Sequence, residues 1–193
     1  MDDVYNYWLG VVVIAVVGTL AHFIYDWSGK NKIIGLFTAV NESTWEHIKI
    51  ALTPTILWSL YDGFIYGFNP NYFCAKLMSL IVLVFFIPLV FYSYQKISHK
   101  PIFMIDIATF FIAIILSQLT FYVIINLAPM WPIFQYLSCI LTFVFFGCYM
   151  TLTLEPLKNL IFKDPLTGKY GFRGHSDIFK LRKNKTQGKK SKE

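Results

Sequence analysis

Eight polar side chains in this sequence are of the types that bind a small ligand or transfer a proton, and they lie near the ends of long apolar segments. Carboxylates and imidazoles that come together at the edge of a membrane bind metal ions or exchange protons. Glu42 is the first candidate among them, because it has no basic partner at helical spacing. The candidates for ligand binding are His22, Asp26, Asn41, Glu42, Glu46, His47, Lys49 and Asp106.

Three of these side chains suggest a metal site. His22 and Asp26 are spaced i, i+4, which places them on one face of a helix. With His47 they could bind a divalent metal ion, and Glu42 or Glu46 could then activate a water molecule. In the simpler alternative Asp26 only holds the His22 ring in orientation. The sequence leaves both interpretations open.

Two other candidates, Glu46 and Lys49, have local explanations, whereas Asp106 needs a partner from another helix. Ser43-Thr-Trp-Glu46 predicts a capping box that starts a helix directly after Ser43. Lys49 follows Glu46 by three residues, a spacing that allows an ion pair on one helix. Asp106 is a lone carboxylate inside an apolar segment, where it costs roughly 2.5–3.5 kcal/mol unless it is paired or hydrated. We expect Lys49 or His22 to be its partner.

Five apolar segments must position these side chains. Each is near the roughly 20 residues that cross a ~30 Å hydrocarbon core as a helix. Of the whole chain, 56% is hydrophobic and 15% charged, so one membrane domain accounts for most of it. We predict an all-α, polytopic transmembrane helix bundle over residues 1–160, with five spans at about 7–25, 45–67, 72–94, 102–127 and 131–154.

The distribution of basic residues predicts the orientation of the bundle. When the gaps between the five segments are numbered alternately, all Lys and Arg residues except Lys76 fall on one side. Basic residues accumulate on the cytoplasmic side of membrane proteins. The N-terminus is therefore expected outside, the C-terminus in the cytoplasm, and the protein in the cytoplasmic (plasma) membrane as a multi-pass protein.

Residues 161–193 are predicted to be a basic cytoplasmic tail, largely disordered after residue 180. From Lys180 onward half of the residues are basic and none is aromatic. Such a tail binds anionic lipid headgroups of the bilayer. Because this tail and the membrane topology account for the net charge of +6, nucleic acid is not an expected partner. A homo-oligomer or another membrane protein remains open as a partner.

The candidate side chains share one depth in the predicted bundle. Four of the five segments contribute a charged or titratable group within about a turn of the cytoplasmic boundary, and the first connection also holds an apolar run, Ile33 to Val40, that is too short to span. This run either lies in the interface or enters partway. Asp62 lies in the outer part of the second segment, and we expect it at the membrane–water interface and not in a site. One stripe of the fourth segment is small or polar and is expected to face the other helices: Asp106, Thr109, Ala113, Ser117 and Thr120.

Three motifs carry a resemblance to a known family. They are His22-Phe-Ile-Tyr-Asp26-Trp-Ser-Gly, Gly35-Leu-Phe, and Val40-Asn-Glu-Ser-Thr-Trp-Glu-His-Ile-Lys49. They resemble a family of uncharacterised small bacterial integral membrane proteins, and the similarity extends through most of the five segments. The resemblance implies a membrane protein but no reaction, ligand or partner.

The motifs of several enzyme classes are missing. The sequence has no P-loop, no HExxH and no GxSxG motif, and it lacks the paired glutamates of the CAAX-type intramembrane proteases. The sequence therefore favours a non-enzymatic protein that binds or transports a small cationic or protonatable ligand at the polar layer. The alternatives are a metal-dependent membrane-embedded hydrolase acting on a lipid or prenyl substrate, and a structural or accessory membrane subunit.

Overall fold

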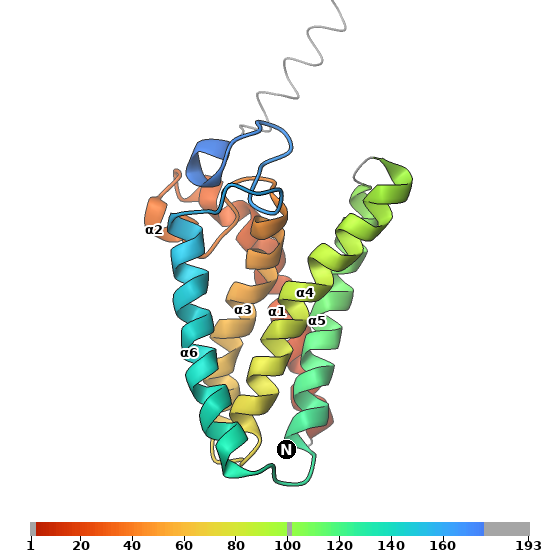
Figure 1. Ribbon diagram of the computed structural model, residues 1–193, viewed down its shortest axis with the longest axis vertical. Coiled ribbons are helices and arrows are strands. Elements are labelled where there is room, and N and C mark those ends of the chain that lie inside the picture. Colours follow the sequence, from red (N-terminus) through yellow and green to blue (C-terminus); the bar gives the residue numbers. More distant parts are fainter. Residues whose placement is uncertain (1–2, 100–101, 176–193) are drawn as a thin grey trace, which may run out of the picture.

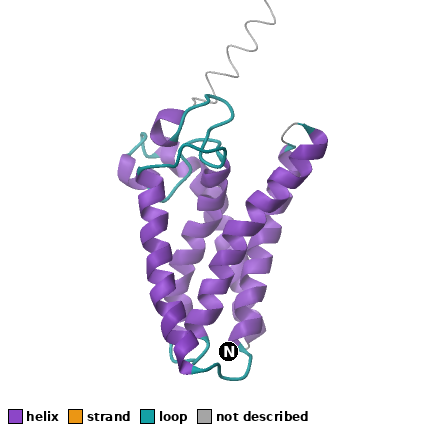
Figure 2. Cartoon of the chain, viewed as in Figure 1, coloured by secondary structure: helices purple, strands orange, loops and turns teal. Residues whose placement is uncertain are grey.

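The computed structural model describes residues 3–99 and 102–175, and its regular elements there are all helices (Figure 2). The predicted all-α class is confirmed. The order along the chain is α1 (Asp3–Trp27), α2 (Lys32–Gly35), α3 (Thr44–Tyr66), α4 (Tyr72–Ser98), α5 (Phe103–Ile125), α6 (Pro132–Leu154) and the 3-10 helix η1 (Gly171–Gly174). The five predicted segments coincide with α1 and with α3 to α6, and their ends differ by at most four residues.

Four helices are long and apolar enough to cross a membrane, namely α1, α4, α5 and α6. These helices fit a membrane protein. The helix α3 is not among them, although it is as long as α5 and α6, at 23 residues each. It contains Glu46, Lys49 and Asp62, which lower its mean hydropathy. The predicted count of five spans and the predicted orientation therefore stay predictions.

The helix α3 lies at the centre of the bundle and packs against α1, α4 and α5 (Figure 1). Most of its residues from Thr44 to Thr55 are buried. We call the end of the bundle that carries residues 28–43 and 155–175 the capped end, and the end where α1 begins the opposite end. The chain runs from the opposite end through α1 to the capped end, and α3 then returns it to the opposite end (Figure 1).

The helix α4 separates from the bundle towards the capped end. Among its described residues Ile87 is the last buried one, and in α5 burial starts at Thr109. Pro88 comes directly after Ile87 in α4. A proline inside a helix removes a backbone hydrogen bond and favours a bend. The hairpin of α4 and α5 accordingly leans away from α3 and α6 (Figure 1).

Asn71 joins the two short connections at the opposite end. Its Nδ2 donates to the carbonyl oxygens of Leu127, Ile124 and Ala128 at 2.9, 3.2 and 3.2 Å, and its Oδ1 accepts from the backbone N–H of Met130 at 2.9 Å. Asn71 is fully buried. A single amide therefore satisfies the helix end of α5 and fixes the start of α4 beside it.

Large apolar side chains cover the outside of the bundle. In water such a continuous apolar surface would drive association, whereas in lipid it carries no penalty. The outer surface thus fits a hydrocarbon environment. The exposed side chains include Phe64, Phe85, Leu89, Phe103 and Phe143.

The run from Ile33 to Val40 is partly helical and partly buried. Asn31 caps α2, because its Oδ1 accepts from the N–H of Ile33 at 2.9 Å. Ile33 is 71% exposed, whereas Ala39 and Val40 are buried. The run therefore starts on the surface and then turns into the bundle.

Candidate functional site

Glu42 lies between two histidines at the capped end. Its Oε1 is 3.7 Å from Nε2 of His22 in α1, and its Oε2 is 3.8 Å from Nε2 of His47 in α3. The two imidazole rings are stacked with centroids 6.1 Å apart. All three side chains keep some exposure, with 22% for Glu42, 29% for His22 and 39% for His47. Three separate segments thus bring together the carboxylate and both imidazoles that the sequence singled out.

The distances around Glu42 are too long for direct hydrogen bonds. His47 is oriented by its other ring nitrogen, because Nδ1 lies 3.0 Å from the carbonyl oxygen of Ser43. A carbonyl oxygen only accepts, so Nδ1 donates to Ser43, and Nε2 is the ring nitrogen that lies nearest to Glu42. When Nε2 carries no proton, it and Oε2 of Glu42 are two acceptors 3.8 Å apart. Such a pair is stabilised by a proton, a cation or a donor held between them.

Asp106 lies in a pocket beside this group. Among the residues that line the pocket, His47 and Asp106 come from α3 and α5, and Phe91 comes from α4. The pocket holds about 30 Å³, which is room for one or two water molecules or a small cation. Asp106 accepts a hydrogen bond from the hydroxyl of Tyr94. The predicted partners, Lys49 and His22, are engaged elsewhere.

Glu46 and Lys49 form the predicted ion pair. Oε2 of Glu46 is 2.6 Å from Nζ of Lys49, and both side chains are sealed from the surface. Lys49 also donates to the carbonyl oxygen of Gly35 at 2.9 Å, and Glu46 accepts from the N–H of Val40 at 3.0 Å. The pair therefore anchors the first connection to α3, and it is closed to a ligand.

The predicted capping box is wrong in its contacts, although the helix does begin at Thr44. Within the described residues the Ser43 hydroxyl makes no cap bond, and Glu46 reaches Val40 instead of returning to Ser43. The N–H of Ser43 donates to Oδ1 of Asn41 at 2.8 Å. The Asn41 side chain therefore holds the chain just before the helix, and the reciprocal cap does not form because the buried Lys49 holds Glu46 inside the bundle.

The segment after α6 folds over the capped end. Nδ2 of Asn41 donates to the carbonyl oxygen of Gly171 at 2.9 Å, and Asn41 is buried. The ring of Phe162 packs on Trp45 at a centroid distance of 4.9 Å. Residues 164–168 form a turn, since Asp164 accepts from the N–H groups at 166 and 167. The basic residues from 176 onward lie outside the described residues.

Asp26 pairs with this segment and not with His22. Its Oδ1 lies 3.1 Å from Nε2 of His175, and the Asp26 side chain is 51% exposed. The structure does not assemble His22, Asp26 and His47 into a metal site: across residues 3–99 and 102–175, no group of three or more His, Cys, Asp or Glu side chains is arranged to hold a metal ion.

The pairing of Asp62 with Lys76 was also not predicted. Oδ2 of Asp62 in α3 is 2.5 Å from Nζ of Lys76 in α4, near the opposite end, and both side chains are buried. Lys76 also lies over the ring of Phe121, 4.2 Å from its centroid. The sequence holds a usable signal for this pair, because the isolated Asp62 and the isolated Lys76 lie four residues before the end of α3 and four residues after the start of α4.

Comparison with known proteins gives one family. Residues 3–172 match the family of unknown function DUF6512, and the chain belongs to that family. The match covers all six α-helices and the residues around Glu42. No curated protein and no solved structure matches the chain.

Proposed function

We propose that this member of a family of unknown function is a membrane protein that binds a small cationic or protonatable ligand between Glu42, His22 and His47. The observation that carries the proposal is the approach of Oε2 of Glu42 to Nε2 of His47, 3.8 Å apart and without a direct hydrogen bond. When Nε2 is unprotonated both atoms are acceptors, and a proton or a cation between them relieves their repulsion. The group stays partly exposed, so a ligand can reach it.

The surrounding candidates divide into ligand-binding and positioning residues. Asp106 adds a second carboxylate across the pocket that His47 also lines. Asn41, Glu46 and Lys49 hold the first connection in place through buried hydrogen bonds. The proposed site therefore has an excess of negative charge at its surface and neutralised charge beneath it, which favours a cation over an anion.

We also propose that all five long helices span the membrane, with the capped end in the cytoplasm and the N-terminus outside. The helix α3 starts at the capped end and ends at the opposite end, alongside helices that are apolar enough to span (Figure 1). Its charged residues Glu46, Lys49 and Asp62 all have ion-pair partners inside the bundle. Paired charges of this kind are tolerated in a span when they face the bundle interior.

Binding of small cations to the detergent-purified protein tests the proposed ligand class. The probes are radiolabelled methylammonium, guanidinium and Mn²⁺, each measured by equilibrium dialysis with wild type and with Glu42→Gln. We expect saturable binding of at least one probe by the wild type and its loss in the variant. Glu155→Gln is the matched control, because Glu155 is an exposed carboxylate at the same end. Equal binding by wild type and Glu42→Gln, or no binding of any probe, contradicts the proposal.

Elemental analysis of the purified protein separates the two chemical classes of cation. The wild type is compared with His22→Ala under conditions that retain bound ions. One metal ion per chain that disappears in the variant would make a metal the ligand and favour the metal-dependent hydrolase. Metal-free protein that still binds methylammonium would leave an organic cation as the ligand.

A further inference from the structure

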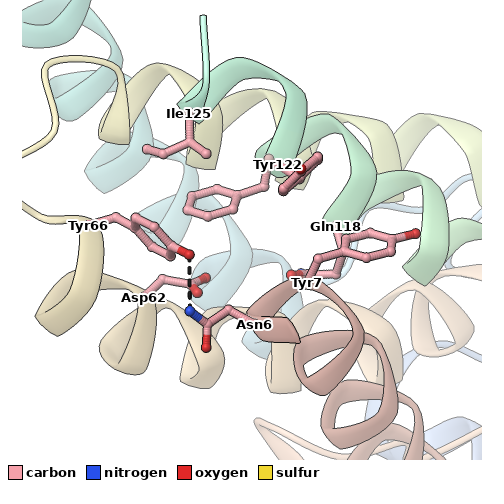
Figure 3. A pocket seen from close by; sticks show the side chains of 8 residues that line it. Asn6, Tyr7, Asp62, Tyr66, Gln118, Tyr122 and Ile125 are labelled. Carbon is pink, nitrogen blue, oxygen red and sulfur yellow. Dashed lines mark hydrogen bonds between the residues drawn. The ribbon is translucent and has the colours of Figure 1, made fainter. Parts of the chain in front are cut away.

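A small polar pocket lies near the opposite end, between α1, α3 and α5 (Figure 3). Asn6 and Tyr66 meet at its edge, where Nδ2 of Asn6 donates to the Tyr66 hydroxyl at 3.2 Å. The carboxylate of Asp62 lies beside this hydrogen bond (Figure 3). Gln118 and Phe121 of α5 complete the wall. The pocket is far from the site at Glu42. The helix α3 begins next to Glu42, and Asp62 comes sixteen residues after Glu46 on this helix, about 24 Å at 1.5 Å per residue.

The side-chain amide of Gln118 is buried beside this pocket, and its neighbours do not satisfy its N–H donors. The side chain is 2% exposed, and its Nε2 has no hydrogen-bond partner among the residues that the structure describes. A buried donor without an acceptor is costly, and such groups in proteins normally bind ordered water. Because Gln118 lines the pocket, that donor has a cavity next to it.

We propose that this pocket is a binding site for one water molecule, held by Nε2 of Gln118 and adjoining the ion pair of Asp62 and Lys76. The cavity of about 10 Å³ is close to the least space that a water needs, and it is too small for an organic ligand. The water accepts from Gln118 and donates to an oxygen of the wall. A bare cation does not fit this role, because the unpartnered group is a donor.

A water molecule in this pocket lies next to the ion pair of Asp62 and Lys76, because Asp62 lines the pocket. Oδ2 of Asp62 binds Nζ of Lys76 at 2.5 Å, and a carboxylate still has lone pairs for a further donor. The site therefore hydrates one buried charged pair near the opposite end, independently of the ligand proposed near Glu42. Its failure and the failure of that proposal are separate results.

Hydroxyl-radical labelling with mass spectrometry tests the water site on the full chain in lipid nanodiscs. Radicals formed from bound water modify adjacent aromatic rings even when those rings are buried. Phe121 lines the pocket and is 5% exposed, and Phe162 is equally buried but lies at the capped end, outside this pocket. We expect Phe121 to be labelled about fivefold faster than Phe162, and the excess to disappear in Gln118→Met, which removes the water's donor.

The matched control is Gln135→Met, which alters the same residue type near the same end, outside the pocket. This variant should retain the fast labelling of Phe121. Equal labelling of Phe121 and Phe162 in the wild type overturns the proposal, and so does fast labelling that persists in Gln118→Met. If Gln118→Met does not fold, the comparison of the two rings in the wild type decides alone.

Discussion

Nζ of Lys49 lies 2.6 Å from Oε2 of Glu46 in the interior of the bundle, and neither side chain is more than 4% exposed. Breaking a buried pair leaves one charge uncompensated, which costs about 3–5 kcal/mol. Lys49→Met should therefore lower the free energy of unfolding by about that amount. The double variant Glu46→Gln/Lys49→Met should recover much of the loss, because no lone charge remains. Thermal unfolding in detergent measures both.

The exposed Lys32 supplies the control for this pair, and Lys32→Met should leave the unfolding temperature unchanged. If Lys49→Met were as stable as wild type, the ion pair would contribute nothing to the fold. The anchoring of Gly35 and Val40 through these two side chains would then need another explanation.

Gly18 lets α1 approach α3 closely. A Cβ atom at this position would lie 2.6 Å from the carbonyl oxygen of Ile50, closer than real Cβ contacts allow. Gly18→Val should therefore force the two helices apart and lower the unfolding temperature, or prevent folding. Gly147→Val is the control, since a Cβ there meets nothing within 4 Å. Equal stability of the two variants would argue against the close contact of α1 and α3.

Phe162 fixes the segment that covers the capped end. It is 5% exposed and packs on Trp45. Phe162→Ala should cost about 3–5 kcal/mol, the range for removing a buried phenyl ring. Phe64→Ala is the comparison, because Phe64 is 90% exposed at the outer surface and should cost far less in detergent. The difference between the two unfolding temperatures reports how firmly residues 156–175 are docked.

The sequence predicts the helices well because long apolar runs have one stable solution in lipid. All five long segments are found within four residues of their expected ends. The pairing of charged side chains is harder to predict, since it depends on which helix faces which. Asp26 pairs with His175 near the end of the described chain, a contact that no local spacing reveals. Local pairing was right only for Glu46 and Lys49, three residues apart on one helix.

In the candidate site, too, the sequence predicts the depth of the side chains but not their contacts. His22, Glu42 and His47 were expected at one depth, and the fold brings them together. The position of Glu42 relative to the two histidines depends on where the first connection lies. That connection is fixed by the hydrogen bond between Asn41 and the segment after α6. These contacts are between distant parts of the chain, so the helical periodicity of any one span carries no information about them.

Cysteine labelling tests on which sides of the membrane the connection of α5 and α6 and the capped end lie. Single cysteines replace Ala128, in the connection of α5 and α6, and Lys169, in the segment over the capped end, after Cys74, Cys139 and Cys148 are changed to Ala. A membrane-impermeant thiol reagent added to intact cells should label position 128 and spare position 169. Lysed cells, in which both positions should react, are the control. The reverse pattern would mean that α3 does not cross the membrane or that the orientation is inverted.

The two ring nitrogens of His47 can be separated by substitution. An Asn side chain can place an amide N–H near the position of Nδ1, which lies 3.0 Å from the carbonyl oxygen of Ser43, but it has no group at the position of Nε2. His47→Asn should therefore keep the unfolding temperature and lose cation binding. His47→Gln can place an amide near Nε2 and should retain part of the binding, at a cost in stability. If His47→Asn bound the cation as wild type does, Nε2 would not be a ligand-binding atom, and the site would rest on Glu42 with His22 and Asp106 instead.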